Sequence, residues 1–453
     1  MYDLKKSFSL FLNSLTEAGE RFNYAGFAAR IQRIKISSLL NLPETSKNYF
    51  YWNKPADNLE FIGFDECLHF KEIEQSLNFK NSGSFFCNWD KLETEEFPLF
   101  IGSQKFNSDE VNNELWEDYS NSEWYIPKFL ILNYGNTSHS YLVFNFAVKP
   151  NAFAFLEEQL DEFLKILDTA QKTPKLSNKN RIEELEFQTS EKLWTKNINK
   201  ALKEIERETF KKVVLSRISG YSTEQEISSS FLIDELAERY PDCYIFGLKK
   251  NDSLFFGASP EKLLKMYNGT LEIDSLAGSA ARGSTGIKDK KLGDELLNSG
   301  KNRREQKTVT RYIENILSKY TAKISSDENP KLKKLKNIQH LWTVIKADLN
   351  EENLPLILKE LHPTPAVCGM PKQEAIDFIL QNEDYPRGYY AGFTGWIGNK
   401  SSGEFCVSIR SALLRKNKLY LFAGCGIVEG SEPEKEYEET KLKLKPILSL
   451  FNL

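Results

Sequence analysis

The residues with the clearest potential for chemistry lie in the last third of the chain, in four segments rich in glycine, proline or isolated charged side chains. They are LHPTPAVCGMPK at 361–372, EFCVSIRSALL at 404–414, FAGCGIVEGS at 422–431 and EYEETKLK at 436–443. Glycines let backbone N–H groups approach a ligand closely, and a nearby cation can hold an anion. The pattern favours a binding site for a small anionic molecule, although each glycine segment taken singly could be no more than a turn.

Three glutamates could hold a hard cation. Glu436 and Glu439 share one face of a predicted helix, with Lys443 one turn further. Glu305 lies on the apolar face of a second predicted helix, four residues before Val309. Carboxylates without nearby His or Cys suit Mg²⁺ better than zinc. The plainer interpretations are a solvated acidic face for the pair and a charge favoured by the helix dipole for Glu305.

Two basic side chains could act on a substrate. In KKVVLSR, strand alternation places Lys212 beside an apolar neighbour, and a desolvated lysine can become a general base. In EFCVSIRSALL, alternation puts Arg410 among small residues, where a planar anion could be held bidentately. The alternatives are a lysine at a strand edge pointing into water and an arginine paired with Glu404 or Glu429.

Composition and net charge restrict the kinds of protein that this chain could be. Of the 453 residues 40% are hydrophobic and 27% charged, enough for a buried interior in one large domain or two ordinary ones. The net charge of -4, with only a short basic run at 331–336, disfavours nucleic-acid binding. Six scattered cysteines, no signal-like N-terminal core and no long apolar run predict a cytosolic protein with reduced thiols and no membrane partner.

Periodicity predicts the elements that must position these residues. Residues 1–190 contain a strand-like run at 142–150 and an acidic helix at 154–170, and offer no chemistry of their own. A helix at 191–208 opens the second part of the chain. The main strands expected after it lie at 211–222, 243–250, 253–259, 404–414 and 419–428, the last two joined as a hairpin. The expected class is α+β with largely antiparallel sheets.

Ten segments together resemble the chorismate-utilising enzymes, in the family's order and with similar spacing. They are KVVLSR, GASPEKLL, LAGSAARG, the Glu305 helix, QHL, LHPTPAVCG, RGYYAGFTGW, EFCVSIRSAL, AGCGIVEGS and EYEET. The resemblance implies one large fold with two facing, largely antiparallel sheets flanked by helices and the active site in the cleft between them. Residues 1–190 would be a divergent N-terminal half of this sandwich, and 191–453 the chorismate-binding catalytic region.

LHPTPAVCG is similar to the isochorismate synthase version of its segment, so the resemblance implies conversion of chorismate to isochorismate, for menaquinone or a siderophore. Lys212 would activate the water that adds at C2, and Glu261 would protonate the departing C4 hydroxyl. Mg²⁺ would be held by Glu305 and Glu439, with Glu436 acting through water. The substrate-binding residues would be Gly278, Ser279, His340, Ala366, Tyr390, Arg410, Gly424, Gly426 and Lys443.

Three other activities stay open: salicylate synthase, a component of anthranilate or aminodeoxychorismate synthase, and a silent chorismate-binding protein. The HPTPA segment and Lys212 argue against the members that use ammonia, so we expect a monomer without an obligate glutaminase partner. Gln306 stands where the family often has histidine, which weakens the expected support of the metal site. His362 is expected to be a buried core imidazole.

Overall fold

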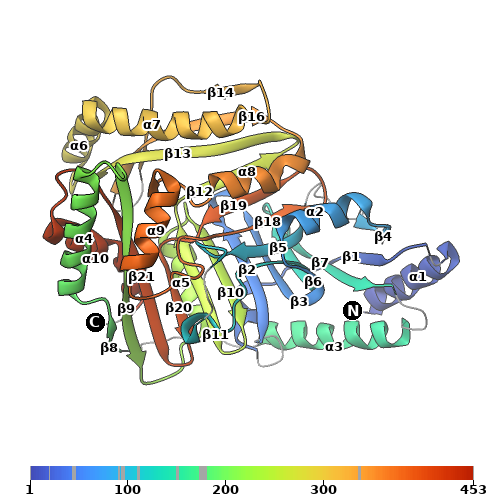
Figure 1. The fold of residues 1–453 in the computed structure, drawn as a ribbon. Helices are drawn as coiled ribbons and strands as arrows, with labels where there is room; N and C mark the ends of the chain where they lie inside the picture. Colours follow the sequence, from blue (N-terminus) through green and yellow to red (C-terminus); the bar gives the residue numbers. More distant parts are fainter. Residues whose placement is uncertain are drawn as a thin grey trace.

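The computed structural model describes residues 2–19, 21–42, 47–89, 92, 97–109, 113–148, 153–172, 181–334 and 338–451 (Figure 1). Its helices are α1 Tyr2–Ala18, α2 Ile73–Ser82, α3 Phe153–Lys172, α4 Glu191–Glu206, α5 Ser229–Arg239, α6 Gly286–Asn298, α7 Gly300–Leu317, α8 Leu354–Leu361, α9 Lys372–Asn382 and α10 Pro433–Leu448. The helices predicted at 154–170 and 191–208 are thereby confirmed as α3 and α4.

The strands form a 21-stranded hydrogen-bonded network, almost entirely antiparallel. Their bounds are β1 Tyr24–Gln32, β2 Asn48–Lys54, β3 Leu59–Phe70, β4 Phe85–Cys87, β5 Pro98–Gln104, β6 Ser122–Tyr134, β7 His139–Ala147, β8 Ile182–Gln188, β9 Lys212–Thr223, β10 Tyr244–Lys250, β11 Ser253–Ser259, β12 Lys262–Tyr267, β13 Thr270–Ala281, β14 Ile324–Ser326, β15 Lys331–Lys334, β16 Ile338–Asp348, β17 Gly369–Met370, β18 Phe393–Gly398, β19 Gly403–Val407, β20 Ser411–Arg415 and β21 Lys418–Ile427. The strand-like run at 142–150 falls largely in β7, and its last two residues, Lys149 and Pro150, lie outside the described residues.

The network folds into two layers that share the long strand β6. The first layer runs β4-β1-β7-β6-β3-β2-β10-β11-β20-β21-β9, and both β8 and β17 pair with the outer edge of β9. The second leaves the start of β6 and runs β5-β18-β19-β12-β13-β16, with β14 and β15 on β16. The expected α+β class with largely antiparallel sheets is confirmed.

Alternation along the strands decides which face meets the other layer. In β2, Phe50 and Trp52 belong to the core between the layers, whereas Tyr49 and Tyr51 belong to the core on the opposite face. Across the interlayer core, Tyr244 of β10 donates a hydrogen bond to Glu404 of β19, with 2.7 Å between the oxygens.

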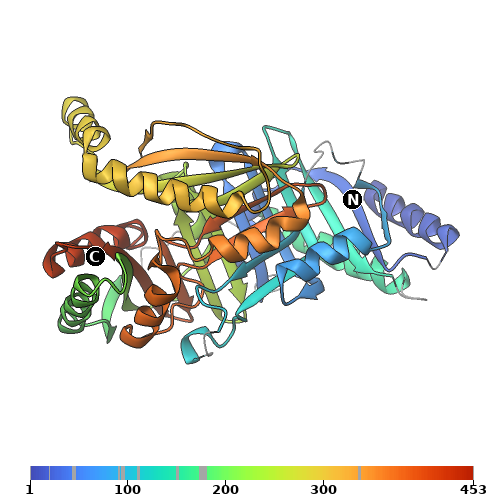
Figure 2. The ribbon, with the colours of Figure 1, turned by 45° about the horizontal axis from the view of Figure 1, so that its top comes forward.

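Helices cover the outer faces. α1, α3 and α5 contribute to the second core, and α7 lies along β13 and β16 at the top of Figure 1. α7 begins where the Ser299 side chain accepts a hydrogen bond from the Asn302 amide, and it buries Val309, Ile313 and Ile316 at helical spacing. α10 packs on β21 beside α4, and Figure 2 shows both at the same end of the molecule. Within the described residues, no helix combines the length and hydrophobicity needed to cross a bilayer.

The predicted strand at 404–414 is wrong as a single element. β19 pairs in the second layer and β20 in the first, and the chain crosses between them through Ser408–Arg410. Arg410 has a left-handed backbone (φ 52) and its carbonyl accepts a hydrogen bond from Ala258. Strand alternation therefore does not set the direction of Arg410. The hairpin from β20 to β21 is confirmed.

Gly388 allows a close approach to Trp116. Its φ is +55°, and an added Cβ would lie 2.1 Å from Trp116 Cε2. We expect Gly388→Ala to lower the free energy of unfolding by about 3 kcal/mol, combining left-handed strain with overpacking. Gly135→Ala is the matched control, because φ is +58° and its Cβ would meet nothing within 4 Å. Urea denaturation of the two variants would contradict this account if both lost the same stability.

Candidate active site

Lys212 opens β9 and meets Glu305 from α7. Lys212 Nζ lies 3.2 Å from Glu305 Oε1, and the side chains are 20% and 35% exposed. The expectation that Lys212 lies beside apolar neighbours rather than charges therefore differs from the structure. The stem of the lysine passes over Gly426, where an added Cβ would lie 2.8 Å from Lys212 Cε. This glycine provides space for the catalytic candidate itself.

The pair of glutamates on α10 faces β21. Lys443, one turn after Glu439, lies 2.6 Å from its carboxylate and also donates to the Gly424 carbonyl at 2.8 Å. Glu436 is half-buried on the same side, where its carbonyl contacts Cys425 Sγ. The predicted i, i+3 arrangement is thus present. Pro433 at the start of the helix and acidic residues in its first turn explain why α10 begins here.

Glu261 lies between β11 and β12 and lines a narrow cavity beside Asp274. Burial and the charge of Asp274 raise the pKa of its carboxyl, to about 7 when the neighbouring cations are included. Lys333, Lys212 and Lys443 lower it. These lysines come from β15, β9 and α10, so three separate elements place a cation near one carboxyl. At neutral pH a substantial fraction of Glu261 carries a proton.

A second group gathers around Arg410. Burial lowers the pKa of its guanidinium, while Tyr390, Glu439 and Glu261 act in the opposite direction. The Tyr390 ring is buried and stacks on Phe422 with centroids 5.3 Å apart. Its hydroxyl would lie 3.0 Å from a Cβ at Gly424, so this second glycine also makes room for a side chain. The alternative partner Glu404 is engaged by Tyr244 and Lys265 instead.

His340 of β16 lies opposite Ser279 of β13. A bulge at Gly278, where φ is +70°, shifts the strand register, and Ser279 Oγ lies 2.9 Å from His340 Nδ1. Burial, together with the charges of Arg410 and Lys443, lowers the pKa of His340 to about 4. The imidazole is therefore neutral near pH 7 and able to exchange hydrogen bonds with a polar ligand.

Ala366 lies in the loop after α8 and lines a narrow cavity together with Glu261, Asp274, Thr364 and Pro365. His362, at the start of this loop, is 4% exposed and packs edge-on against the ring of Phe393. Burial lowers its pKa to about 3, as expected for a neutral core imidazole.

Ion pairs and charge effects thus connect candidate residues from both layers. Lys212 pairs with Glu305 and Lys443 pairs with Glu439, and the charges of both lysines act on Glu261. The charges of Tyr390 and Glu439 act on Arg410, and the charge of Arg410 acts on His340. Each of the two principal metal-ligand candidates is paired with a lysine. A cation between them would have to replace those ion pairs.

Lys333 and Asp274 were given no role from the sequence, and Gln306 was considered only as a departure from the family pattern. Lys333 lies 2.8 Å from Asp274, which burial would keep neutral but which Lys333 and Lys262 hold at a pKa below the usual range. The signal for Lys333 was the basic run at 331–336, whose last two residues lie outside the described residues.

Gln306 is 2% exposed and donates to Ser275 and Thr343, so it ties α7 to β13 and β16. Its role here is to anchor the helix that carries Glu305.

A different cluster satisfies the spacing of a metal site among the described residues. Glu66, His69 and Glu123 offer ligand atoms within 4.8 Å of one another. Lys250 already lies 2.6 Å from Glu66 and 3.4 Å from Glu123, with its ammonium over the ring of Tyr125. This cluster is therefore an ion-pair site filled by a lysine.

Comparison with known proteins identifies the family. The family described as chorismate binding enzyme matches residues 11–452. The chain belongs to this family. The chorismate-binding fold is also seen in the menaquinone-specific isochorismate synthase MenF of Escherichia coli, with a TM-score of 0.80, 24% identity and coverage of 98% of this chain and 99% of that one.

Two curated relatives are similar over most of their length. Isochorismate synthase MenF of Bacillus subtilis is 32% identical over 89% of this chain and 87% of the relative. The salicylate biosynthesis isochorismate synthase of Pseudomonas aeruginosa is 30% identical over 87% and 83%. Anthranilate synthase component I of Streptococcus pneumoniae shares the fold at a TM-score of 0.68 and 18% identity, covering 86% and 92%. The fold alone therefore does not separate the family's reactions.

The charges around Glu261 predict opposite responses to two substitutions. Lys333→Met removes a cation that favours the carboxylate, so the pKa of Glu261 should rise above about 7. Asp274→Asn removes an anion that opposes it, so the pKa should fall. Infrared titration of the carboxyl band, assigned by its loss in Glu261→Gln, measures both. Shifts in the same direction, or none, would contradict this account of the charges.

Proposed function

We propose that this protein is an isochorismate synthase, which moves the hydroxyl of chorismate from C4 to C2. One observation carries the proposal: Lys212 and Glu261 belong to two different layers, and the charge of the lysine acts on the carboxyl. The reaction needs a base and an acid on different atoms of one ring, and this placement supplies both. The names of the two curated relatives support the same reaction.

Lys212 is the proposed base. An ammonium held by a carboxylate cannot accept a proton, so we infer that Lys212 leaves Glu305 and loses its proton before the reaction begins. The free amine then takes a proton from a water molecule as the water oxygen bonds to C2. The ring double bonds shift and the C4–O bond breaks.

Glu261 is the proposed acid. With a pKa of about 7 it holds a proton near neutral pH and donates that proton to the departing C4 hydroxyl, which leaves as water. One water is added and one is released, so the product is an isomer of chorismate. Exchange with solvent returns the proton from Lys212 and reloads Glu261.

The remaining side chains hold the substrate. Arg410 presents a planar guanidinium to a carboxylate, with Tyr390 beside it. The neutral His340, oriented by Ser279, is suited to a hydrogen bond with the C4 hydroxyl. The backbone around Gly278, Gly424 and Gly426 and the Ala366 loop are assigned to the walls of the substrate pocket.

Glu305, Glu439 and Glu436 match a Mg²⁺ ion in the chemistry of their donors, because all three offer hard carboxylate oxygens and are only partly buried, but their carboxylate oxygens do not all lie within 4.8 Å of one another in this structure. When bound there, the ion would neutralise the ring carboxylate and make C2 more electrophilic. Lys443 would then balance the charge of the glutamates from the side of β21.

We also propose that residues 1–190 complete the same sandwich as the catalytic region 191–453. Pairing of β2 with β10, β5 with β18 and β8 with β9 supports this, since each pair joins the two parts. A monomer that needs no glutaminase fits a reaction that uses water, and six free cysteines fit a reducing cytosol. Isochorismate made here would enter menaquinone or siderophore synthesis.

Purified protein should convert chorismate to isochorismate with Mg²⁺ and without ammonium, as followed by chromatography. Lys212→Ala should lower kcat by about 10²- to 10⁴-fold, because general-base catalysis is lost. Lys211→Ala, its exposed neighbour, is the control and should keep kcat. Accumulation of salicylate with pyruvate, or a strict need for ammonium, would replace the proposed reaction with another of the family.

Glu439→Gln should raise the Mg²⁺ concentration for half-maximal activity by at least the roughly 10- to 100-fold seen when metal sites lose a supporting partner. Glu438→Gln is the matched control, since Glu438 is exposed on α10 and pairs with Lys441 at 2.6 Å. Equal Mg²⁺ requirements in the two variants would exclude Glu439 as a ligand. The measurement is a Mg²⁺ titration of the initial rate.

A further inference from the structure

The outer edge of β9 has a gap in its strand pairing. β17 pairs only with Lys212 and Val213 at the start of β9. One further backbone hydrogen bond, from the Val214 amide to the carbonyl of Cys368 just before β17, has a length of 2.7 Å. β8 takes up the edge again from Ser219. Between them, backbone groups of Val214 and Ser216 face a segment with no strand. A buried backbone group must find a partner or it destabilises the fold.

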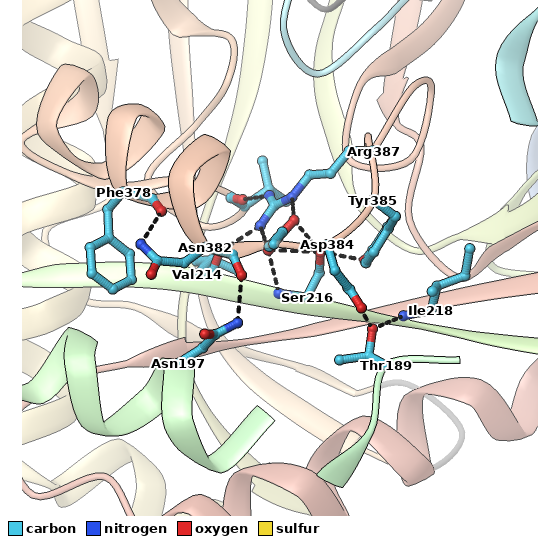
Figure 3. Close-up of polar contacts among 12 residues, drawn as sticks. Thr189, Asn197, Val214, Ser216, Ile218, Phe378, Asn382, Asp384, Tyr385 and Arg387 are labelled. Carbon is cyan, nitrogen blue, oxygen red and sulfur yellow. Dashed lines mark hydrogen bonds and ion pairs between the residues drawn. The ribbon is translucent and has the colours of Figure 1, made fainter. Parts of the chain in front are cut away.

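Two charged side chains close the gap, and we call them the brace: Glu383 and Arg387. Arg387 donates to the Val214 carbonyl at 2.7 Å, and Glu383 accepts from the Ser216 amide at 2.7 Å. The brace is joined by two hydrogen bonds, at 2.5 and 2.8 Å, and its side chains are 2% and 3% exposed. Figure 3 shows Arg387 over the strand beside Val214 and Ser216. These side-chain hydrogen bonds take the place of the backbone hydrogen bonds that a neighbouring strand would make with Val214 and Ser216.

The brace also reaches the substrate loop. Arg387 donates a fourth bond, at 2.9 Å, to the carbonyl of Val367, the residue after Ala366. One guanidinium therefore links the strand of Lys212 to the loop proposed to line the substrate pocket. Tyr385 adds a bond of 2.7 Å to the Ser216 hydroxyl (Figure 3).

The segment that carries the brace is itself fixed on either side. The Asn197 side chain of α4 donates to the Asn382 carbonyl at 2.6 Å, and the Thr189 hydroxyl donates to Asp384 at 3.2 Å (Figure 3). Thr189 in turn exchanges hydrogen bonds with Ile218 of β9. The brace is therefore held in one place relative to α4 and the end of the gap, where β8 resumes pairing.

Stability alone is a weak reason to bury such a pair. Desolvating two charges offsets most of their attraction, and well-packed apolar residues are often as stable. The charged pair instead fixes geometry. The planar guanidinium of Arg387 donates four hydrogen bonds in set directions, and these hold the strand and the loop relative to each other. Lys212 lies two residues from the anchored carbonyl of Val214, so a shift of the strand there moves the amine.

We infer that Glu383 and Arg387 are positioning residues for Lys212, holding its strand at the distance from the Ala366 loop that the water-adding step requires. This inference rests on the proposed function. The brace touches no substrate and acts through β9. Its loss should therefore affect turnover more than substrate binding.

The test compares Arg387→Ala with Lys80→Met. Lys80 is the matched control because it is a buried lysine that pairs with Glu351 at 2.6 Å and donates to the Lys400 carbonyl, on elements outside the cleft. At a temperature where both variants are folded, we expect Arg387→Ala to lose about 100-fold in kcat with KM changed only a few-fold, as a misplacement of about 1 Å can cause. Lys80→Met should lose thermal stability and keep kcat.

Guanidinium rescue and a conservative variant sharpen the test. Millimolar guanidinium should restore part of the kcat of Arg387→Ala and leave Lys80→Met unchanged. If Arg387→Ala does not fold, Arg387→Lys replaces it, because one ammonium cannot reproduce the planar set of bonds and kcat should still fall. A kcat within twofold of wild type in a folded Arg387 variant would overturn the inference.

A readout without turnover separates this inference from the proposed function. Acetylation of Lys212, measured by mass spectrometry relative to Lys211, reports the position of the amine beside Glu305. We expect Arg387→Ala to raise this ratio several-fold, and an unchanged ratio would overturn the inference whichever product wild type forms. If wild type forms no isochorismate but the ratio changes, the proposed function fails and the positioning role stands.

Discussion

The structure depends on one constraint: β9 must keep its backbone hydrogen bonded on both edges while its first residue reaches the cleft. β21 satisfies one edge over ten consecutive residue pairs. The other edge is satisfied in turn by β17, by the side chains of Glu383 and Arg387, and by β8. Because each partner comes from a different part of the chain, the position of Lys212 follows from the assembly of the whole C-terminal region.

The charged side chains of the candidate site largely balance one another. Four basic side chains gather there, from β9, β15, α10 and the crossing between the layers: Lys212, Lys333, Lys443 and Arg410. Such a concentration would be destabilising without counter-charges. Glu305, Glu439 and Asp274 supply them through direct ion pairs. Glu261 is set apart, because burial keeps it partly protonated among cations, which suits its proposed role as a proton donor.

The glycines of β21 show how side chains and backbone share this space. Gly426 leaves room for the Lys212 stem and Gly424 for the Tyr390 hydroxyl. The sequence had suggested that these glycines bring N–H groups close to an anion, yet the nearest atoms to their missing Cβ belong to neighbouring parts of the protein. At Gly424 and Gly426 the strand must carry no side chain, because a Cβ there would overlap with atoms of the neighbouring residues.

The sequence by itself determined the class of fold, the family and the local elements. The apolar stripe of α7, the i, i+3 glutamates of α10 and the alternation of β9 depend only on residues close in the chain, so periodicity predicted them. The tertiary structure alone decided the rest. It broke the expected strand at Arg410 because β19 and β20 pair in different layers. It also placed Glu305 on Lys212 and joined Glu383 to β9, contacts between residues about 90 and 170 positions apart that no local pattern encodes.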